Sequence, residues 1–226
     1  MPLRSLPMRL LALILFALQA GCAAPGGAAR HSEDIAAATR ASLAHFEASR
    51  AVQPALLALP EATAIVIFPH VFSASFVVGG SEADGMLFVR DRDTGHWLGP
   101  VFYSLSRGSI GMQAGASTAE LLMIVNSPGA LRSISKGHLR LGIEASVAIG
   151  RGGGASSAIT ADIDSYALSK GLSAGVALDG SALRIRPDLN AAWYGQAVTL
   201  DDIVVRRAVT SPDAGRLAAA VEALAP

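Results

Sequence analysis

The clearest pattern in the sequence is an alternation of apolar with polar or small residues between Leu139 and Ile149. A period of two predicts a β-strand with one buried face and one polar or small face. These eleven residues exceed the usual strand length of ~5–6 residues. A strand of this length predicts a large curled or barrel-like sheet, in which glycines relieve the bending.

Other segments have the same strand character. The alternating or continuous apolar runs occupy residues 64–68, 72–78, 86–90, 97–105, 110–116, 121–125, 172–178 and 182–185. We expect hairpin turns at Asp91–Gly95 and Arg107–Gly108, and we expect residues 172–178 to pair with 182–185. Because these strands do not alternate with helices, the pattern argues against a parallel α/β sheet.

Helices are predicted at both ends of this strand region. Residues 33–50 form an amphipathic helix with Ser32 as its cap, which either packs on the domain or lies on a membrane surface. Its polar face has few basic residues, which argues against the membrane surface. Pro54 and Pro60 bracket a short helical turn. Residues 128–136 form a helix that Ser127 caps and that ends before Gly137, and a C-terminal helix starts at Pro212 with Ser211 as its cap. The predicted fold class is α+β, with a long glycine-rich antiparallel sheet between an N-terminal and a C-terminal helix.

Composition narrows the function classes. The 226 residues suit one domain, and the formal net charge is zero. Removal of Arg4 and Arg9 with a targeting segment leaves 16 of the 18 basic residues against 18 acidic ones, a net charge of −2. The absence of a polybasic run argues against general nucleic-acid binding. A single cysteine excludes an internal disulfide and a multi-cysteine zinc site.

The N-terminal residues 1–22 have the pattern of an export signal. Residues 1–21 combine two arginines with an apolar run, 10–18, that is too short to span a membrane comfortably. Ala20 and Gly21 before Cys22 resemble the lipobox of bacterial lipoproteins, although Gln19 stands where that motif prefers Leu. The resemblance implies a lipid anchor on Cys22 and, because Ala23 follows, the periplasmic face of the outer membrane. The alternative is a plain secretory signal cut near Ala24. Residues 22–31 then form a flexible tether and 32–226 a single domain.

Three motifs give little support for catalysis or for a cofactor. Ser173 lies in a G-x-S-x-G pattern, but the predicted strand continues past it, and all five histidines precede it, whereas hydrolases of this type place the histidine later. The glycines of 150–154 lack the Lys-Ser/Thr of a phosphate-binding loop, which favours a hairpin loop. No histidine pair has helical spacing, so His70 is better explained as an ordinary surface or core residue than as a metal ligand. We expect no enzyme activity, cofactor or metal.

Four basic or titratable side chains are predicted to converge. Arg132 and Lys136 are spaced i, i+4 on the short helix, and His138 and Arg140 share one face of the long strand. Such a cluster is either a solvated surface patch or a site for anionic lipid headgroups, because arginine and lysine pair well with phosphate oxygens.

A set of short motifs lies in order along the chain, at 64–69, 76–80, 97–100, 108–111 with Gly115, 141–142, Tyr166, 169–171, Gly175, 180–181 and 190–195. Together these segments resemble the SYLF domain, a lipid-binding family of bacterial lipoproteins and eukaryotic membrane-associated proteins. The sequence departs from the family pattern at Ser75, Ala83, Arg151 and Trp193-Tyr194.

The resemblance implies a non-enzymatic protein that binds membrane phospholipids. Eukaryotic members are associated with phosphoinositides and actin, whereas a bacterial envelope has no actin and little phosphoinositide, so we carry over lipid binding as a class. The alternative is a structural envelope protein that binds a protein partner through its sheet.

Overall fold

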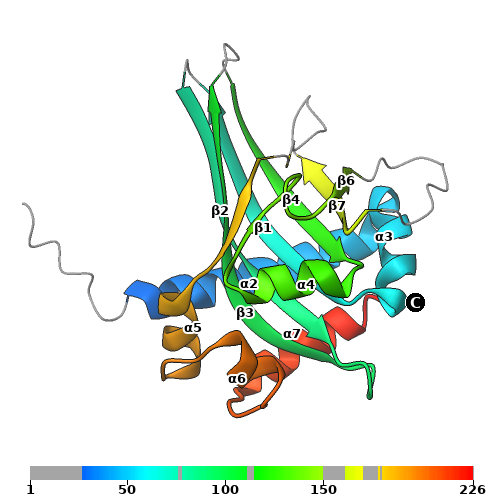
Figure 1. The fold of residues 1–226 in the computed structure, drawn as a ribbon, viewed down its shortest axis with the longest axis vertical. Coiled ribbons are helices and arrows are strands. Elements are labelled where there is room, and N and C mark those ends of the chain that lie inside the picture. The colour runs from blue at the N-terminus through cyan, green and yellow to red at the C-terminus, as the bar shows by residue number, and fades with distance from the viewer. Residues whose placement is uncertain are drawn as a thin grey trace, which may run out of the picture.

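The computed structural model describes residues 27–75, 78–110, 115–149, 161–169, 178 and 180–225. The predicted α+β class is confirmed, because an eight-stranded sheet lies among helices that come from both ends of the chain (Figure 1). The described helices are α2 (Gly27–Ala48), α3 (Gln53–Ala58), α4 (Pro128–Ser135), α5 (Pro187–Tyr194), α6 (Leu200–Val204) and α7 (Pro212–Glu222). The described strands are β1 (Ala64–Ser75), β2 (Val78–Arg90), β3 (Trp97–Ile110), β4 (Gly115–Val125), β5 (His138–Arg140), β6 (Val147–Ile149), β7 (Ile163–Ser169) and β8 (Ala182–Ile185).

The order of strands in the sheet is β5-β8-β3-β2-β1-β4-β7-β6. Neighbouring strands are antiparallel except for β6 and β7, which are parallel. The two edge strands, β5 and β6, follow each other in the chain and are separated only by residues 141–146. A link this short joins the two edges only if the sheet curls, which confirms the predicted curled sheet.

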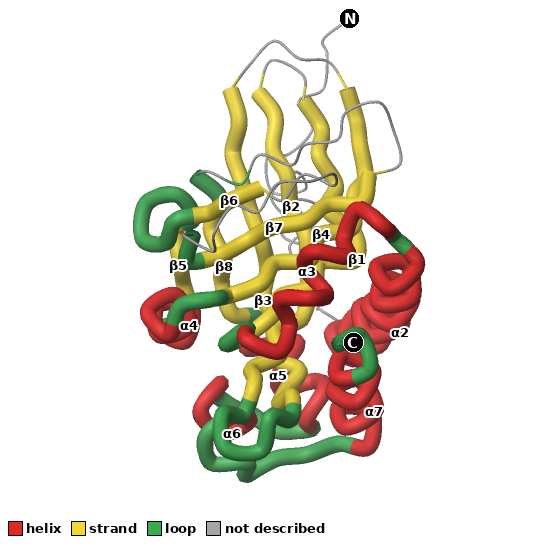
Figure 2. Tube along the Cα trace, turned by 90° about the vertical axis from the view of Figure 1, so that its right-hand side faces the viewer, coloured by secondary structure: helices red, strands yellow, loops and turns green. Residues whose placement is uncertain are grey.

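Both faces of the sheet are buried in the half that the helices cover. Ile65 and Ile67 of β1 pack in one core cluster with residues of α2, α3 and α7, whereas Val66 and Phe68 pack in a second cluster with residues of α4, β5 and α6. Figure 2 shows α4 on one side of the sheet and α2 with α7 on the other. Burial on both faces explains why residues 64–68 are continuously apolar. All described members of both clusters lie between Ala28 and Ala225, so a protein without residues 1–22 keeps both cores.

Strand β1 does not end at Pro69, as its sequence suggested, but passes through it. The pairing register shifts around Pro69 and His70 on both sides, against β2 and against β4. Proline has no N–H for the ladder, so a bulge accommodates it inside a central strand. Gly85 of β2 lies against this bulge, where a Cβ atom would overlap the backbone of Ile67 and the ring of Phe68. The bulge therefore requires glycine at position 85.

The prediction of one long strand over 139–149 is wrong. The chain forms the short strand β5, turns at Gly142 with a φ of 77°, and resumes as β6 at the opposite edge of the sheet. Leu141 and Ala145 are buried as the alternation predicts, but Ile143 is 69% exposed. The break is needed because the chain crosses here from one edge of the sheet to the other.

Three other predictions need correction. Helix α2 already begins by Gly27, so residues 27–31 are helix instead of tether, and Ser32 is buried inside it and donates to the carbonyl of Ala29. Strand β3 runs through Arg107 and Gly108 without the predicted turn. Strand β8 lies between β3 and β5 in the sheet and pairs with both, so both of its sides are occupied and the predicted pairing with 172–178 is wrong. Residues 172–177 themselves lie outside the described residues. The sequence analysis did not predict β7, α5 or α6, and the loop predicted at 150–154 lies outside the described residues.

Asn190 of α5 is buried, and its side chain hydrogen-bonds to the backbone of β3 at a position that the pairing with β8 does not cover. Its Oδ1 accepts from the backbone N–H of Phe102 at 2.8 Å, and its Nδ2 donates to the carbonyl of Phe102 at 3.4 Å. The side chain therefore satisfies the N–H of Phe102 just beyond the end of the pairing of β3 with β8. The carbonyl of Phe102 also accepts from the backbone N–H of Arg186 at 2.9 Å.

We predict that Asn190→Ala lowers the free energy of unfolding by ~1–3 kcal/mol, because it leaves the buried backbone N–H of Phe102 without its partner. Chemical denaturation of the variant and of Gln196→Ala, an exposed control on the following turn, measures this difference. Equal stability of the two variants would contradict the role of Asn190.

Asp162 ties three segments together next to α4. Its carboxylate accepts from the Ser127 hydroxyl at 2.7 Å, and from the Ser146 N–H at 3.0 Å and hydroxyl at 2.8 Å. Ser127 also caps α4 as predicted, since its hydroxyl oxygen accepts from the N–H of Ala130. The hydrogen bonds from Ser127 and Ser146 lower the pKa of Asp162 below its ordinary value.

A lowered pKa means that the unfolded state binds the proton more tightly than the folded state. The contribution of Asp162 to stability is therefore complete above the unfolded pKa of ~3.9 and is lost as the pH falls through the lower folded pKa. We expect Asp162→Asn to be less stable than the wild type near neutral pH and to lose less stability on acidification below pH ~4. Denaturation curves over this range check the slope, and Asp93→Asn, at an exposed hairpin position, should keep the slope of the wild type.

Candidate functional site

Helix α4 carries the first two of the predicted cationic residues. Its N-terminus is defined by the Ser127 cap and by Pro128 in the first turn. Ala130 and Ile134 face the core and are 3% and 1% exposed, whereas Arg132 and Lys136 are exposed on the opposite side. The spacing of i, i+4 therefore places both cations on the solvent face, as predicted.

The C-terminus of α4 is fixed to the sheet. The N–H of Gly137 donates to the carbonyl of Ile134 at 2.9 Å, and Gly137 has a φ of 88° that favours glycine. The hydroxyl of Tyr103, on β3, donates to the same carbonyl at 3.0 Å. Burial raises the pKa of Tyr103, so its hydroxyl remains a donor at any physiological pH. The short connection at Gly137 leads directly into β5.

Strand β5 and its neighbour β8 supply the remaining cationic or titratable side chains. His138 and Arg140 are exposed, and Leu139 between them is fully buried. The register pairs His138 with Arg184 of β8, which is also exposed. The sequence analysis missed Arg184. Its alternation with the buried Leu183 predicts an outward side chain, but the pairing of β8 with β5 depends on the tertiary fold.

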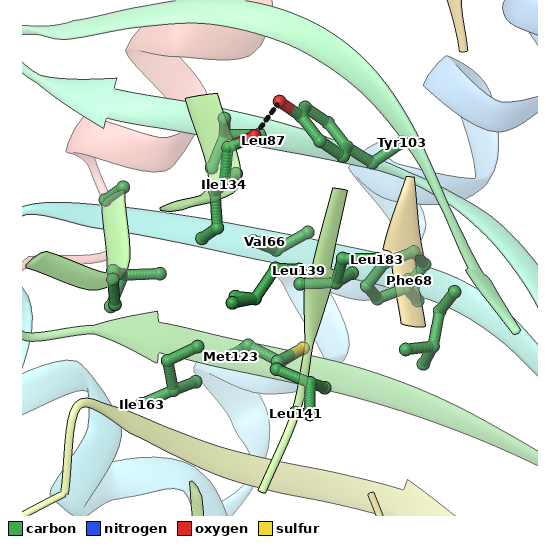
Figure 3. Close-up of a cluster of buried hydrophobic side chains, with 14 of the residues drawn as sticks. Val66, Phe68, Leu87, Tyr103, Met123, Ile134, Leu139, Leu141, Ile163 and Leu183 are labelled. Atoms are coloured by element: carbon green, nitrogen blue, oxygen red, sulfur yellow. Dashed lines mark hydrogen bonds between the residues drawn. The ribbon is translucent and has the colours of Figure 1, made fainter. Parts of the chain in front are cut away.

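Helix α4 leads directly into β5 and contacts it, β5 pairs with β8, and the buried side chains of all three elements pack in one cluster, so the three elements are neighbours on the outside of that cluster. Figure 3 shows Ile134, Leu139, Leu141 and Leu183 together in this buried cluster. We call the exposed set on the outside of α4, β5 and β8 the basic face. Its members are Arg132, Lys136, His138, Arg140 and Arg184.

The basic face differs electrostatically from the sites of Arg186 and Arg206. Within the described part of the chain, none of its five side chains forms an ion pair. By contrast, Arg186 bonds to Asp84 and Asp188, and Arg206 lies 2.9 Å from Asp202. The donors of the basic face therefore remain available to an external anion.

The described hollows lie elsewhere, where α2 crosses the bulge of β1. Two open hollows of about 340 and 380 Å³ share Pro69 and His70 in their linings. One hollow is also lined by the pair His45–Glu120, at 2.8 Å, and the other by the pair His31–Asp84, at 2.9 Å. Within the described ranges, no group of three His, Cys, Asp or Glu residues is placed to hold a metal ion. His70 is exposed and lines both hollows.

The remaining sequence candidates lie outside the described residues. These are the predicted lipidation site Cys22, Ser173 and the glycines of 150–154.

Comparison with known proteins identifies the family. A family model described as "Ysc84: Las17-binding protein actin regulator" matches residues 106–224, more than half of the 226 residues. Protein YSC84 of Saccharomyces cerevisiae is 31% identical over 188 residues, which cover 80% of this chain and 39% of that protein. SH3 domain-containing protein PJ696.02 of Schizosaccharomyces pombe is 34% identical over 149 residues, which cover 62% of this chain and 34% of that protein.

A vertebrate relative is similar over a comparable part of the chain. SH3 domain-containing YSC84-like protein 1 of Xenopus laevis is 30% identical over 158 residues, which cover 67% of this chain and 45% of that protein. The chain thus spans less than half the length of these curated relatives, and no solved structure matches it significantly. The resemblance inferred from the sequence motifs is confirmed: the chain belongs to the Ysc84 family, which is the SYLF domain family.

Proposed function

We propose that this protein binds membrane surfaces that contain anionic lipids, through its basic face and without catalysing a reaction. The observation that carries the proposal is the set of exposed cations without ion-pair partners on α4, β5 and β8. Arginine and lysine donors match the oxygens of lipid phosphates, and each cation near an anionic surface contributes ~1 kcal/mol. Rigid packing of all three elements on one core holds these charges together.

A second candidate is a structural envelope protein that binds a protein partner through its sheet. Strands β1 to β4 extend beyond the helices (Figure 1), and Phe72 on β1 is 53% exposed. This candidate requires no preference for anionic lipids, so lipid selectivity separates the two proposals.

The proposed location is the periplasmic face of the outer membrane, with a lipid anchor on Cys22. This location rests on the resemblance of residues 1–22 to a lipoprotein signal. Among the helices that the structure describes, none combines the length and apolar character that crossing a bilayer requires.

We expect Cys22→Ser to lose lipid labelling and to leave the membrane fraction, because the variant lacks the thiol that would carry the acyl chains, and stable anchoring requires more than one such chain. Fractionation of labelled cells measures both effects. A variant that keeps its label would exclude Cys22 as the lipidated residue.

The basic face is tested by vesicle flotation with a protein that lacks residues 1–22. Arg132→Glu/Arg140→Glu should bind phosphatidylglycerol vesicles about 30-fold or more weakly than the wild type, since two cations near the surface contribute ~2 kcal/mol and their reversal adds repulsion. Arg184→Gln alone should weaken binding about fivefold. Binding by the wild type should fall at high salt, where the Debye length is ~3 Å.

The matched control is Arg50→Glu/Arg92→Glu, which has the same net charge but changes exposed cations on other elements. It should retain most of the wild-type affinity. Equal loss in both double variants would show a general charge effect and contradict the basic face as the site. Equal binding of the wild type to phosphatidylcholine and phosphatidylglycerol would contradict the proposed function.

A further inference from the structure

The turn between β5 and β6 presents an isoleucine to solvent beside the basic face. Ile143 is 69% exposed, whereas Leu141 and Ala145 on either side of it are 0% and 4% exposed. A single exposed apolar residue is ordinary in itself. Ile143 is informative because it lies in a fixed turn that begins at Arg140, the last residue of the basic face.

Hydrogen bonds on both sides hold the turn in shape. The N–H of Gly142 donates to the carbonyl of Ala145 at 2.9 Å, and the N–H of Glu144 donates to the carbonyl of Arg140 at 2.9 Å. The N–H of Arg140 in turn donates to Oε2 of Glu144 at 3.2 Å. The buried side chains of Leu141 and Ala145 anchor the ends. Ile143 is therefore held outward by a closed turn, and its exposure does not result from a loose segment.

The surrounding charges distinguish Ile143 from a comparable exposed residue. The turn begins at Arg140, so Ile143 lies next to the end of the basic face. Val205 is also 69% exposed, but it is followed by Arg206 and Arg207, which are bound to Asp202 and Asp91. Within the described residues, Arg140 at the start of the turn forms no ion pair, whereas the arginines next to Val205 are neutralised. The exposed Glu144, which follows Ile143, accepts from the backbone N–H of Arg140.

We infer that Ile143 enters the boundary between headgroups and acyl chains of an anionic bilayer when the basic face binds its phosphates. This inference rests on the proposed function and assigns the orientation of the protein on the membrane. A bilayer surface offers negative charge and, ~5–10 Å deeper, apolar chains, which matches an exposed apolar side chain that lies three residues after Arg140, at the end of the basic face. A stable protein interface buries ~800 Å² on each partner. One exposed isoleucine supplies only a small part of such an area, so it fits a lipid surface better.

The first test compares two serine variants of the protein without residues 1–22. Ile143→Ser should bind phosphatidylglycerol vesicles about tenfold more weakly than the wild type, because transfer of an isoleucine side chain to apolar surroundings is worth about that factor or more. Its dependence on salt should be unchanged, because no cation is lost. Val205→Ser should bind as the wild type does.

The outcomes separate this inference from the proposed function. If charge reversal weakens binding but Ile143→Ser binds like the wild type, the insertion of Ile143 is wrong and the basic face stands. If the wild type shows no preference for phosphatidylglycerol, both are wrong. Loss of binding in Val205→Ser equal to that in Ile143→Ser would also overturn the insertion of Ile143.

A second test reports the environment of the side chain directly. Cys22 is the only cysteine, so Ile143→Cys in the protein without residues 1–22 carries a single environment-sensitive fluorophore. We expect a blue shift with phosphatidylglycerol vesicles and no shift with phosphatidylcholine vesicles. The same label on Val205→Cys should not respond. A label at position 143 that stays in water while the protein is bound would overturn the inference.

Discussion

The structure depends on one constraint of chain connectivity: the two edges of the sheet are joined by six residues, 141–146. In a flat sheet, eight strands spaced ~4.8 Å apart would place the edges ~34 Å from each other. Seven extended steps of the chain reach at most ~24 Å, and the turn at Gly142 shortens the link further. The sheet must therefore curl. Its concave face encloses one apolar cluster, and its other face has to be covered by α2, α3 and α7.

The basic face follows from this closure. The α4–β5 segment packs its apolar side against the concave cluster, so every second residue of β5 and one side of α4 must face solvent. Tyr103 and Asp162 fasten the two ends of α4 to the sheet. Cations on such a framework keep fixed relative positions, unlike those of a basic tail. Their backbone is already ordered, so binding an external anion costs conformational entropy mainly in the side chains.

The family relation concerns the domain and not the whole of the longer relatives. The names of those relatives refer to SH3 domains and to Las17 binding, and this chain covers less than half of each one compared above. A property carried by the shared domain has to arise from its sheet and the elements packed on it. The basic face and the turn at Ile143 lie on such elements, and the family match over residues 106–224 includes them.

The sequence by itself determined the features that depend on neighbouring residues. The caps at Ser127 and Ser211, the cation spacing on α4 and the outward positions of His138 and Arg140 depend on local hydrogen bonds and on helix or strand periodicity. The tertiary structure alone decided which edges meet. It broke the alternation at Gly142, exposed Ile143, brought Arg184 beside His138 and used Asn190 to complete β3. These features depend on contacts between distant segments, and local periodicity is the same whether a strand continues or turns to reach another edge.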